Sequence, residues 1–301
     1  MTLISVLIAL LLDRLTELHR ESRLGHRLGA VAETIAVRLP AERGGIAAAL
    51  IVVLPPALVL LAVQWLVGGW LYGLGGLILG IVVLLPCLGP LDVHDVLEDY
   101  IEARSNDDRE RSDWFYERLT GELVPDSPEE EARDIVESVF VRAHDNLFAT
   151  IFWFCVLGPA GALLYRVAAE AALQPPPGIV ARPELGRALR HVLGLLGWIP
   201  ARLMAFGYAM TGSFEHALGR LRDGTEGADD LYSANGWLLV NTGTAALRGD
   251  DEIARHTPDN GGERRTAQPA EAADGARRLV VRTGVLWLAA LALLTLAGWF
   301  G

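Results

Sequence analysis

Long apolar runs separate the polar segments of this chain, and their lengths match helices that cross a membrane. Residues 44–91 contain no charged side chain and no histidine. At about 1.5 Å per residue, this run is long enough for two helices across a hydrocarbon core about 30 Å thick. The pattern predicts a transmembrane hairpin over 44–91, with its turn at Gly68 and Gly69.

A third span is predicted over 147–172. The uncharged stretch from Asn146 to Tyr165 is 20 residues long, and Asp145 and Arg166 bracket it. A helix of that length crosses a hydrocarbon core. The sequence therefore predicts a span with one charged residue at each membrane edge.

The two remaining apolar runs differ in how clearly they predict a span. Residues 192–214 are interrupted by Arg202, and an arginine is costly in hydrocarbon unless it faces protein or water. This run predicts either a re-entrant segment or a fourth span whose arginine faces the bundle. Residues 283–301 are uncharged throughout and predict the last span.

The polar segment 92–146 has the periodicity of amphipathic helices. One apolar stripe comprises Val93, Val96, Leu97, Tyr100 and Ile101, and a second comprises Ile135, Val136, Val139 and Phe140. Ser127, Pro128 and Glu130 form the pattern of a capping box where the second helix should begin. We expect a cytoplasmic helical region here that runs directly into the third span.

A second large polar region covers 215–278. Within it, residues 249–274 are rich in Gly, Asp, Glu, Pro and Arg, a composition that predicts disorder. The positive-inside rule places the arginine-rich regions 13–43, 92–145 and 215–282 in the cytoplasm, and the loop 174–191 on the opposite side of the membrane.

The chain shows no alternating strand pattern and no repeat of 20–50 residues. The predicted fold class is therefore all-α: one domain over 1–301, a polytopic helical membrane bundle with four or five transmembrane helices and amphipathic cytoplasmic helices. The 51% of hydrophobic residues and the mean hydropathy of +0.31 agree with this class. The lipid bilayer is the expected surrounding.

The net charge of −11 argues against nucleic acid as a partner, because nucleic-acid binding requires a basic stripe. No lysine occurs in the chain, so the lysine of a P-loop is missing. No HExxH or GxSxG motif occurs either, and the histidines are too scattered to predict a metal site. Cys87 and Cys155 lie in apolar runs and are expected to be packing residues.

Four glycines, Gly69, Gly73, Gly76 and Gly80, form small-xxx-small pairs in the second predicted span. Such pairs let another helix approach closely in a membrane. The partner helix could belong to the same chain or to a second copy in a homo-oligomer. A substrate passage is the alternative interpretation.

Nine polar side chains lie where the membrane makes them costly or near its predicted cytoplasmic edge, and we take them as ligand-binding candidates: Asp13, Arg14, His26, His94, Asn106, Asp107, Asp145, Arg166 and Arg202. Six of them also have a structural interpretation. Asp13 and Arg14 fit a solvated helix end, His26 fits a helix surface, and Asn106 with Asp107 fits a turn. Arg202 is either a counter-ion or an anchor for an anionic ligand such as a phosphate. No catalytic residue stands out.

Several short sequence motifs together resemble the AmpE family of bacterial inner-membrane proteins. They are LLDRL and GHRL within 11–28, His94 with Asn106 and Asp107, FATIFWFCVLGPAGALLYR at 148–166, and GWIPARL at 197–203. The resemblance implies a multi-pass protein of the inner membrane that modulates β-lactamase induction, with a role in antibiotic resistance. It also implies sensing or signalling linked to the cell wall, with a small anionic or cell-wall-derived ligand and a protein partner.

The chain is also similar to the cobalamin-pathway synthases CbiB and CobD, which join an amino-alcohol phosphate to a corrinoid carboxylate in an ATP-dependent amide synthesis. The shared motifs are ESV at 137–139, FW at 152–153, GALLYR at 161–166 and IPARL at 199–203. Where the synthases have an acidic and amide pair, this chain has Val141 and Arg142. Their NTLD run is replaced by residues 169–172, and Asp145 alone keeps a matching carboxylate.

Three functions follow, in order of preference. The first is a non-enzymatic membrane protein of sensing or signalling that modulates β-lactamase expression. The second is an amide-forming ligase with ATP and Mg²⁺ as cofactors and Asp145 as a metal or substrate carboxylate. The third is a transporter, disfavoured because no span carries several ionisable residues.

Overall fold

The computed structural model describes residues 2–15, 23–40, 45–67, 74–88, 92–222, 228–255 and 269–297, and every regular element in them is a helix. The all-α prediction is confirmed. In chain order the helices are α1 (Thr2–Leu15), α2 (Arg23–Arg38), α3 (Ile46–Val67), α4 (Leu74–Cys87), α5 (Asp92–Ser105), α6 (Arg109–Thr120), α7 (Pro128–Ala143), η3 (His144–Phe148), α8 (Ala149–Leu157), α9 (Pro159–Leu173), α10 (Pro177–Val180), α11 (Pro183–Thr211), α12 (Phe214–Arg222), α13 (Leu231–Arg255) and α14 (Pro269–Leu296).

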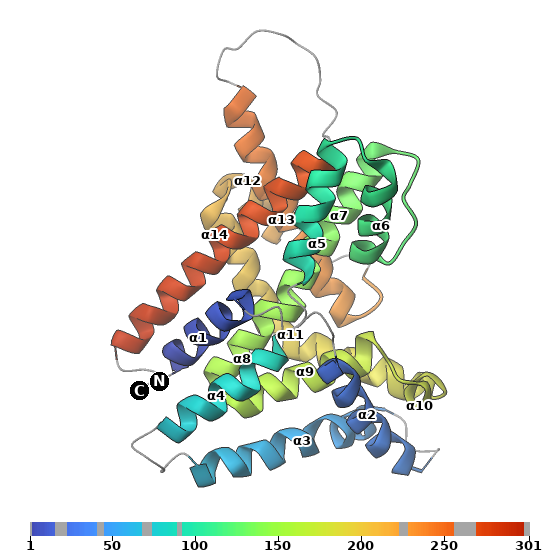
Figure 1. The fold of residues 1–301 in the computed structure, drawn as a ribbon, viewed down its shortest axis with the longest axis vertical. Helices are drawn as coiled ribbons and strands as arrows, with labels where there is room; N and C mark the ends of the chain where they lie inside the picture. Colours follow the sequence, from blue (N-terminus) through green and yellow to red (C-terminus); the bar gives the residue numbers. More distant parts are fainter. Residues whose placement is uncertain are drawn as a thin grey trace.

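Four helical stretches are long and apolar enough to cross a membrane. They are α3, the continuous rod Pro128–Leu157 formed by α7, η3 and α8, α11, and α14. The shorter helices α1 and α4 are also apolar. In Figure 1, α1, α3, α4, α8 and α14 run in roughly the same direction. The protein is therefore a polytopic helical membrane protein.

The predicted third span over 147–172 is not one helix. The chain breaks at Gly158, where α8 ends and α9 begins, and α9 packs back along α8 as a hairpin (Figure 1). Gly158 has φ 67° and ψ −155°, a conformation that is accessible almost only to glycine. Pro159 then takes the first position of α9, where its missing N–H costs nothing. Asp145 and Arg166 consequently lie at the same end of the hairpin instead of at opposite membrane edges.

The two arms of the predicted 44–91 hairpin pack more on other helices than on each other. The two predicted arms are α3 and α4, but α3 packs mainly on α9 and α11, and α4 packs mainly on α1 and α9. Gly80 lets α4 approach α1 closely, because a side chain there would meet Ser5 and Phe154. Gly76 has no neighbour within 4 Å, and Gly69 and Gly73 lie outside the described residues.

The placement of the loop 174–191 on the side opposite to 13–43 is wrong. The backbone N–H of Gly178 donates to Glu33 Oε1 of α2 at 2.8 Å. Arg182 Nη1 donates to the carbonyl oxygens of Ala36 and Leu39 at 2.7 and 3.1 Å. Segments in hydrogen-bonding contact cannot lie on two sides of a bilayer. The error followed from counting α8 and α9 as one crossing.

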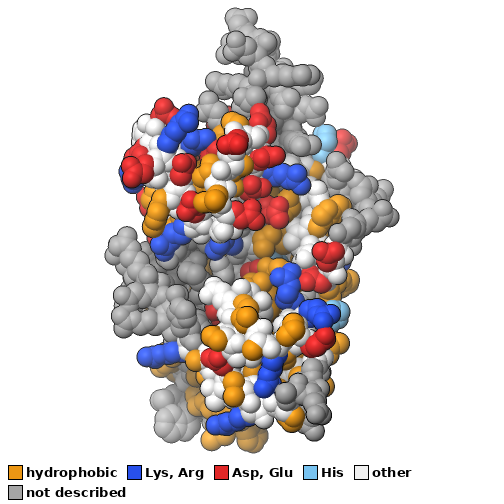
Figure 2. Space-filling model, turned by 90° about the vertical axis from the view of Figure 1, so that its right-hand side faces the viewer, with side chains coloured by type: hydrophobic (Ala, Val, Ile, Leu, Met, Phe, Trp, Pro, Cys, Tyr) orange, Lys and Arg blue, Asp and Glu red, His pale blue; other side chains and the backbone are white. Residues whose placement is uncertain are grey.

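The helices α5, α6 and the first half of α7 form a lobe beside the bundle (Figure 1). Both predicted apolar stripes face its core, where Tyr100, Ile135 and Phe140 are fully buried. Glu131 is buried too, and it accepts hydrogen bonds from Tyr100 at 2.7 Å and Arg104 at 2.6 Å. Figure 2 shows charged side chains of both signs over this lobe, above a surface richer in apolar side chains.

The helices α13 and α14 extend beyond the predicted segment boundaries. Residues 249–255 belong to α13 and 269–274 to α14, so helix covers both ends of the segment predicted to be disordered, while 256–268 lie outside the described residues. The helix that contains the predicted last span begins before 283, because α14 starts at Pro269. Ser127 is the N-cap of α7, but its hydroxyl donates to Glu129 Oε2 instead of capping the backbone.

The tight hairpin makes a prediction about its glycines. A Cβ at Gly161 would overlap the backbone carbonyl oxygen of Trp153, and Gly158→Ala would impose a strained conformation costing about 1–3 kcal/mol. We expect Gly161→Ala and Gly158→Ala each to lower the apparent melting temperature of the purified protein in detergent. Gly186→Ala is the control, because Gly186 lies in α11 with no atom within 4 Å of an added Cβ. An unchanged melting temperature for Gly161→Ala would contradict the hairpin.

Candidate functional site

A π-helical turn lies in the rod where the lobe meets the bundle. In η3 the N–H of Ala149 bonds to the carbonyl of His144, five residues back, so one extra residue enters the turn. Such turns are rare and are frequent at functional sites. Here the two consecutive residues His144 and Asp145 are both buried, at 3% and 5% exposure.

Asp145 is held by three side-chain donors. Its Oδ1 lies 2.8 Å from His144 Nδ1 and accepts from the Tyr165 hydroxyl of α9 at 3.0 Å. Its Oδ2 accepts from the Tyr232 hydroxyl of α13 at 2.7 Å. Burial and the Asp145 carboxylate raise the pKa of the Tyr232 phenol far above its usual value, so this phenol keeps its proton and donates. Three of the about four lone-pair sites of the carboxylate are used.

His144 links η3 to α11. Its Nε2 lies 3.3 Å from the carbonyl oxygen of Gly197, while its Nδ1 faces Asp145. Both neighbouring atoms are acceptors, and only the doubly protonated ring can donate to both. His144 thus connects Asp145 of η3 to the backbone of α11 through its two ring nitrogens.

Pro200 leaves one backbone carbonyl of α11 without its usual helical donor. A proline inside a helix has no N–H for the carbonyl four residues before it. That carbonyl belongs to Leu196, and it accepts instead from Trp153 Nε1 of α8 at 3.0 Å. Gly194 contributes another acceptor, which Asn235 Nδ2 of α13 reaches at 2.8 Å.

Arg166 lies beside Asp145 at the base of the α8–α9 hairpin and is 6% exposed. Its Nη1 donates to Asn146 Oδ1 at 3.2 Å, and its Nη2 forms an ion pair with Glu170, one turn later on α9. Glu170 is also buried, at 5% exposure. Arg166 thus has a buried counter-charge within the same helix.

Arg202 faces the bundle. This was one of the two alternatives predicted for residues 192–214. Its Nη1 donates to Asn235 Oδ1 at 3.2 Å and to the Trp198 carbonyl at 3.1 Å, and its guanidinium stacks 3.9 Å from the centre of the Trp198 ring. Arg142 of α7 interacts electrostatically with Asp145 and Tyr232. We call this whole cluster the polar joint: His144, Asp145, Asn146, Trp153, Tyr165, Arg166, Glu170, Arg202, Tyr232, Asn235 and the α11 carbonyl groups of Gly194, Leu196 and Gly197.

Of the nine predicted candidates, the structure brings Asp145, Arg166 and Arg202 into the polar joint. Asn106 and Asp107 lie exposed in the turn between α5 and α6, where Asp107 has φ 57° and lies 3.8 Å from Arg109. The side chains of Asp13, Arg14, His26 and His94 lie outside the described part of the chain.

Sequence reasoning missed most of the remaining members of the joint. His144, Asp145 and Asn146 form a polar triplet just before an apolar run, which was a usable signal for a buried polar site. Tyr232 and Asn235 lie on α13, three residues apart, and thus share a helix face. No pattern in the sequence marks the π-turn that buries His144 and Asp145 together.

The polar groups of the joint pair with one another. Within the described ranges, no group of three or more His, Cys, Asp or Glu side chains could hold a metal ion. The carboxylate of Asp145 and the guanidinium of Arg166 already have protein partners. The arrangement ties η3, α9, α11 and α13 to one another.

Comparison with known proteins places these residues in a recognised context. A family model described as "Regulatory signalling modulator protein AmpE" matches residues 1–248. "Cobalamin biosynthesis protein CobD" of Chromobacterium violaceum is 34% identical over 139 residues, 46% of this chain and 43% of that protein. The protein of the same name from Stutzerimonas stutzeri is 36% identical over 87 residues, 29% of each chain. The matches span less than half the length of these relatives. No solved structure matches.

The role of Pro200 can be tested with a double-mutant cycle. Trp153→Phe leaves the Leu196 carbonyl without its donor, which should cost about 1–3 kcal/mol of stability. In a Pro200→Ala background, the new N–H of residue 200 can bond to that carbonyl, so the same Trp153→Phe change should cost clearly less. Unfolding of the four proteins in detergent measures the coupling. Additive costs would contradict the assignment.

Proposed function

This chain belongs to the AmpE family, and from that premise we propose that it is a regulatory protein of the bacterial inner membrane that modulates β-lactamase induction without catalysing a reaction. The proposal includes sensing linked to the state of the cell wall. It takes the polar joint as the element through which the membrane-embedded helices and the lobe influence each other.

The observation that carries the proposal is the internal pairing of Asp145 and Arg166. An amide-forming ligase needs carboxylate oxygens for Mg²⁺ and cations for phosphate groups. Here Asp145 accepts from His144, Tyr165 and Tyr232, while Arg166 is paired with Glu170. Residues that could serve such chemistry hold the helices together instead.

The route of the rod supports a regulatory role. The stretch Pro128–Leu157 begins in the lobe, passes through the polar joint at η3 and ends inside the bundle. Tyr232 and Asn235 attach α13 to this point and to α11. A movement of the lobe would therefore be transmitted to the bundle through the joint.

An ATP- and Mg²⁺-dependent ligase is the second candidate, favoured by the partial similarity to the CobD proteins. A ligand that binds only the folded state raises the apparent stability by about RT ln(1 + [L]/Kd). We expect no change in the melting temperature of the purified protein with millimolar ATP and Mg²⁺. A clear rise would favour the ligase.

The regulatory proposal is tested by β-lactamase induction. In a host with an inducible β-lactamase, deletion of the gene should change the induced enzyme level, and the wild-type gene should restore it. The Tyr232→Phe variant lacks one hydrogen bond of the joint, and a gene encoding it should restore the induced β-lactamase level only in part. Tyr116→Phe is a matched control, because its hydroxyl donates to Asp134 in the lobe at 2.8 Å.

Membrane levels of each variant are measured by immunoblotting, so that loss of protein is distinguished from loss of function. Unchanged induction after deletion would overturn the proposed function. If Tyr232→Phe and Tyr116→Phe restore β-lactamase induction equally, at equal protein levels, the polar joint has no part in the proposed function.

A further inference from the structure

The exposed face of α11 changes from polar to apolar along the helix. Its first part carries the exposed side chains of Glu184, Arg187 and His191. The later part carries apolar side chains that are 42% to 63% exposed and recur about every three or four residues, which places them on one face: Leu195, Trp198, Ile199, Leu203, Phe206 and Met210. This apolar face extends for about 22 Å along α11, a helix long enough to cross a bilayer, so hydrocarbon chains are the expected medium beside it.

Arg202 lies within the length of this apolar face, at its edge beside α13. A guanidinium in hydrocarbon is costly unless it is paired or reaches a polar layer. The contacts of Arg202 are all with uncharged groups: Nη1 donates to the Trp198 carbonyl at 3.1 Å and to Asn235 Oδ1 at 3.2 Å, and the guanidinium carbon lies 3.9 Å from the centre of the Trp198 ring. No carboxylate among the described residues forms an ion pair with Arg202. Its positive charge therefore has no counter-ion in this part of the chain.

Two nitrogens of Arg202 remain for a ligand. Both of its protein hydrogen bonds come from Nη1, while Nη2 and Nε make none within the described segments. Neither nitrogen is enclosed, because the enclosed side-chain polar atoms that lack a partner in the described chain belong to Thr150, Tyr208 and Thr242. Together Nη2 and Nε form the edge of a guanidinium that can donate two parallel hydrogen bonds to a phosphate or a carboxylate.

The guanidinium of Arg202 is turned toward the polar part of α11. Its bond to the Trp198 carbonyl places it about one turn nearer to His191 than the Cα of Arg202. The exposed face changes from polar to apolar between His191 and Leu195, so the guanidinium lies about 5 Å from this change along the axis. Arginine side chains bend in this way toward the headgroup layer, where tryptophan is also enriched. Lipid phosphates are the anions at that depth, which favours a lipid over a carboxylate on a partner helix.

We propose that Arg202 and the apolar face of α11 bind one anionic phospholipid of the surrounding membrane. The headgroup phosphate accepts hydrogen bonds from Nη2 and Nε of Arg202, and one acyl chain lies along Ile199, Leu203 and Phe206. The lipid supplies the counter-ion that the described part of the protein does not provide. This binding goes beyond the proposed regulatory role and does not depend on it, although Asn235 connects Arg202 to the rest of the polar joint.

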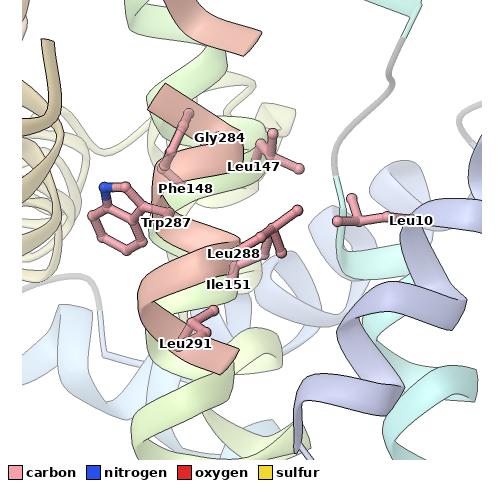
Figure 3. A pocket seen from close by; sticks show the side chains of 8 residues that line it. All are labelled: Leu10, Leu147, Phe148, Ile151, Gly284, Trp287, Leu288 and Leu291. Carbon is pink, nitrogen blue, oxygen red and sulfur yellow. The ribbon is translucent and has the colours of Figure 1, made fainter. Parts of the chain in front are cut away.

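A hollow elsewhere in the bundle provides an internal control. Figure 3 shows it between α1, the rod and α14, with Leu10, Ile151, Trp287 and Leu288 among its lining residues. None of the described residues that line it is charged. Lipid chains that reach Trp287 therefore meet no group that selects a headgroup.

Trp198 provides the readout, because the guanidinium of Arg202 stacks on its ring. The full-length protein is placed in phosphatidylcholine nanodiscs in which a rising fraction of the lipid is brominated phosphatidylglycerol or brominated phosphatidylcholine. The bromines quench indole fluorescence on contact, and subtracting the signal of Trp198→Phe isolates the contribution of Trp198. One arginine near an anionic headgroup changes binding about fivefold. We therefore expect half-maximal quenching of Trp198 at a mole fraction of phosphatidylglycerol about fivefold lower than that of phosphatidylcholine.

Two substitutions on α11 separate a specific site from a general attraction of charge. Arg202→Gln, measured against its own double variant with Trp198→Phe, should bring the two mole fractions to the same value. Arg187→Gln is the matched control, because it removes an arginine from the polar part of the same helix, where Arg187 pairs with Glu184. It should leave the preference of Trp198 unchanged. Trp287, isolated in the same way with Trp287→Phe, should be quenched equally by both lipids.

Equal quenching of Trp198 by the two lipids in the protein with Arg202 intact would overturn the proposal. A preference that persists in Arg202→Gln, or one of the same size at Trp287, would overturn it as well. Absence of quenching at Trp198 by either lipid would show that protein covers this face, which also contradicts a lipid site. Because β-lactamase induction is measured separately in cells, failure of the lipid site is distinguishable from failure of the regulatory role.

Discussion

The closure of the α8–α9 hairpin at its base is the interaction on which the rest of the structure depends. Tyr165 returns to Asp145, and Arg166 returns to Asn146, twenty positions after the chain left that point. Charged groups taken out of water are tolerated only when they are paired and hydrogen-bonded. The buried charges therefore fix where α9 must lie, and α3 and α4 both pack against it.

A buried ion pair is weak evidence for stability, because the desolvation of both ions offsets much of their attraction. Its stronger effect here is on register. If α9 shifted by one residue along α8, Arg166 and Glu170 would keep each other, but Arg166 would lose Asn146 and Tyr165 would lose Asp145. Gly158 and Gly161 act in the same direction, because they set the turn and the close approach that bring the two ends together.

Local periodicity was enough to predict the helices of the lobe, since Ile135 and Phe140 belong to stripes that one core buries. Length alone misled in the hairpin, because a 20-residue apolar run fits a bilayer whether the chain crosses it or turns back. The Gly158–Pro159 dipeptide was the available turn signal. For the site, Asp145, Arg166 and Arg202 were foreseeable from the cost of charge in a membrane. Tyr232 and Asn235 were not, because their roles arise from contacts of α13 with η3 and α11 that no local pattern encodes.

The polar joint lies between separate apolar cores. Its hydrogen bonds therefore affect how these cores are positioned relative to one another. On α11, the buried residues up to Leu193 pack with α2, α3 and α9, while those from Ala201 onward pack with the lobe and α14. The backbone between them bonds to side chains from η3, α8 and α13. Each core resists deformation because it is closely packed, so relative movement is concentrated in the joint.

To invert a population from 1:99 to 99:1, a ligand must favour one arrangement by about 5.5 kcal/mol. Hydrogen bonds to charged groups contribute about 1.5–3 kcal/mol each, so a change in two or three bonds of the joint is of the size that such a switch requires.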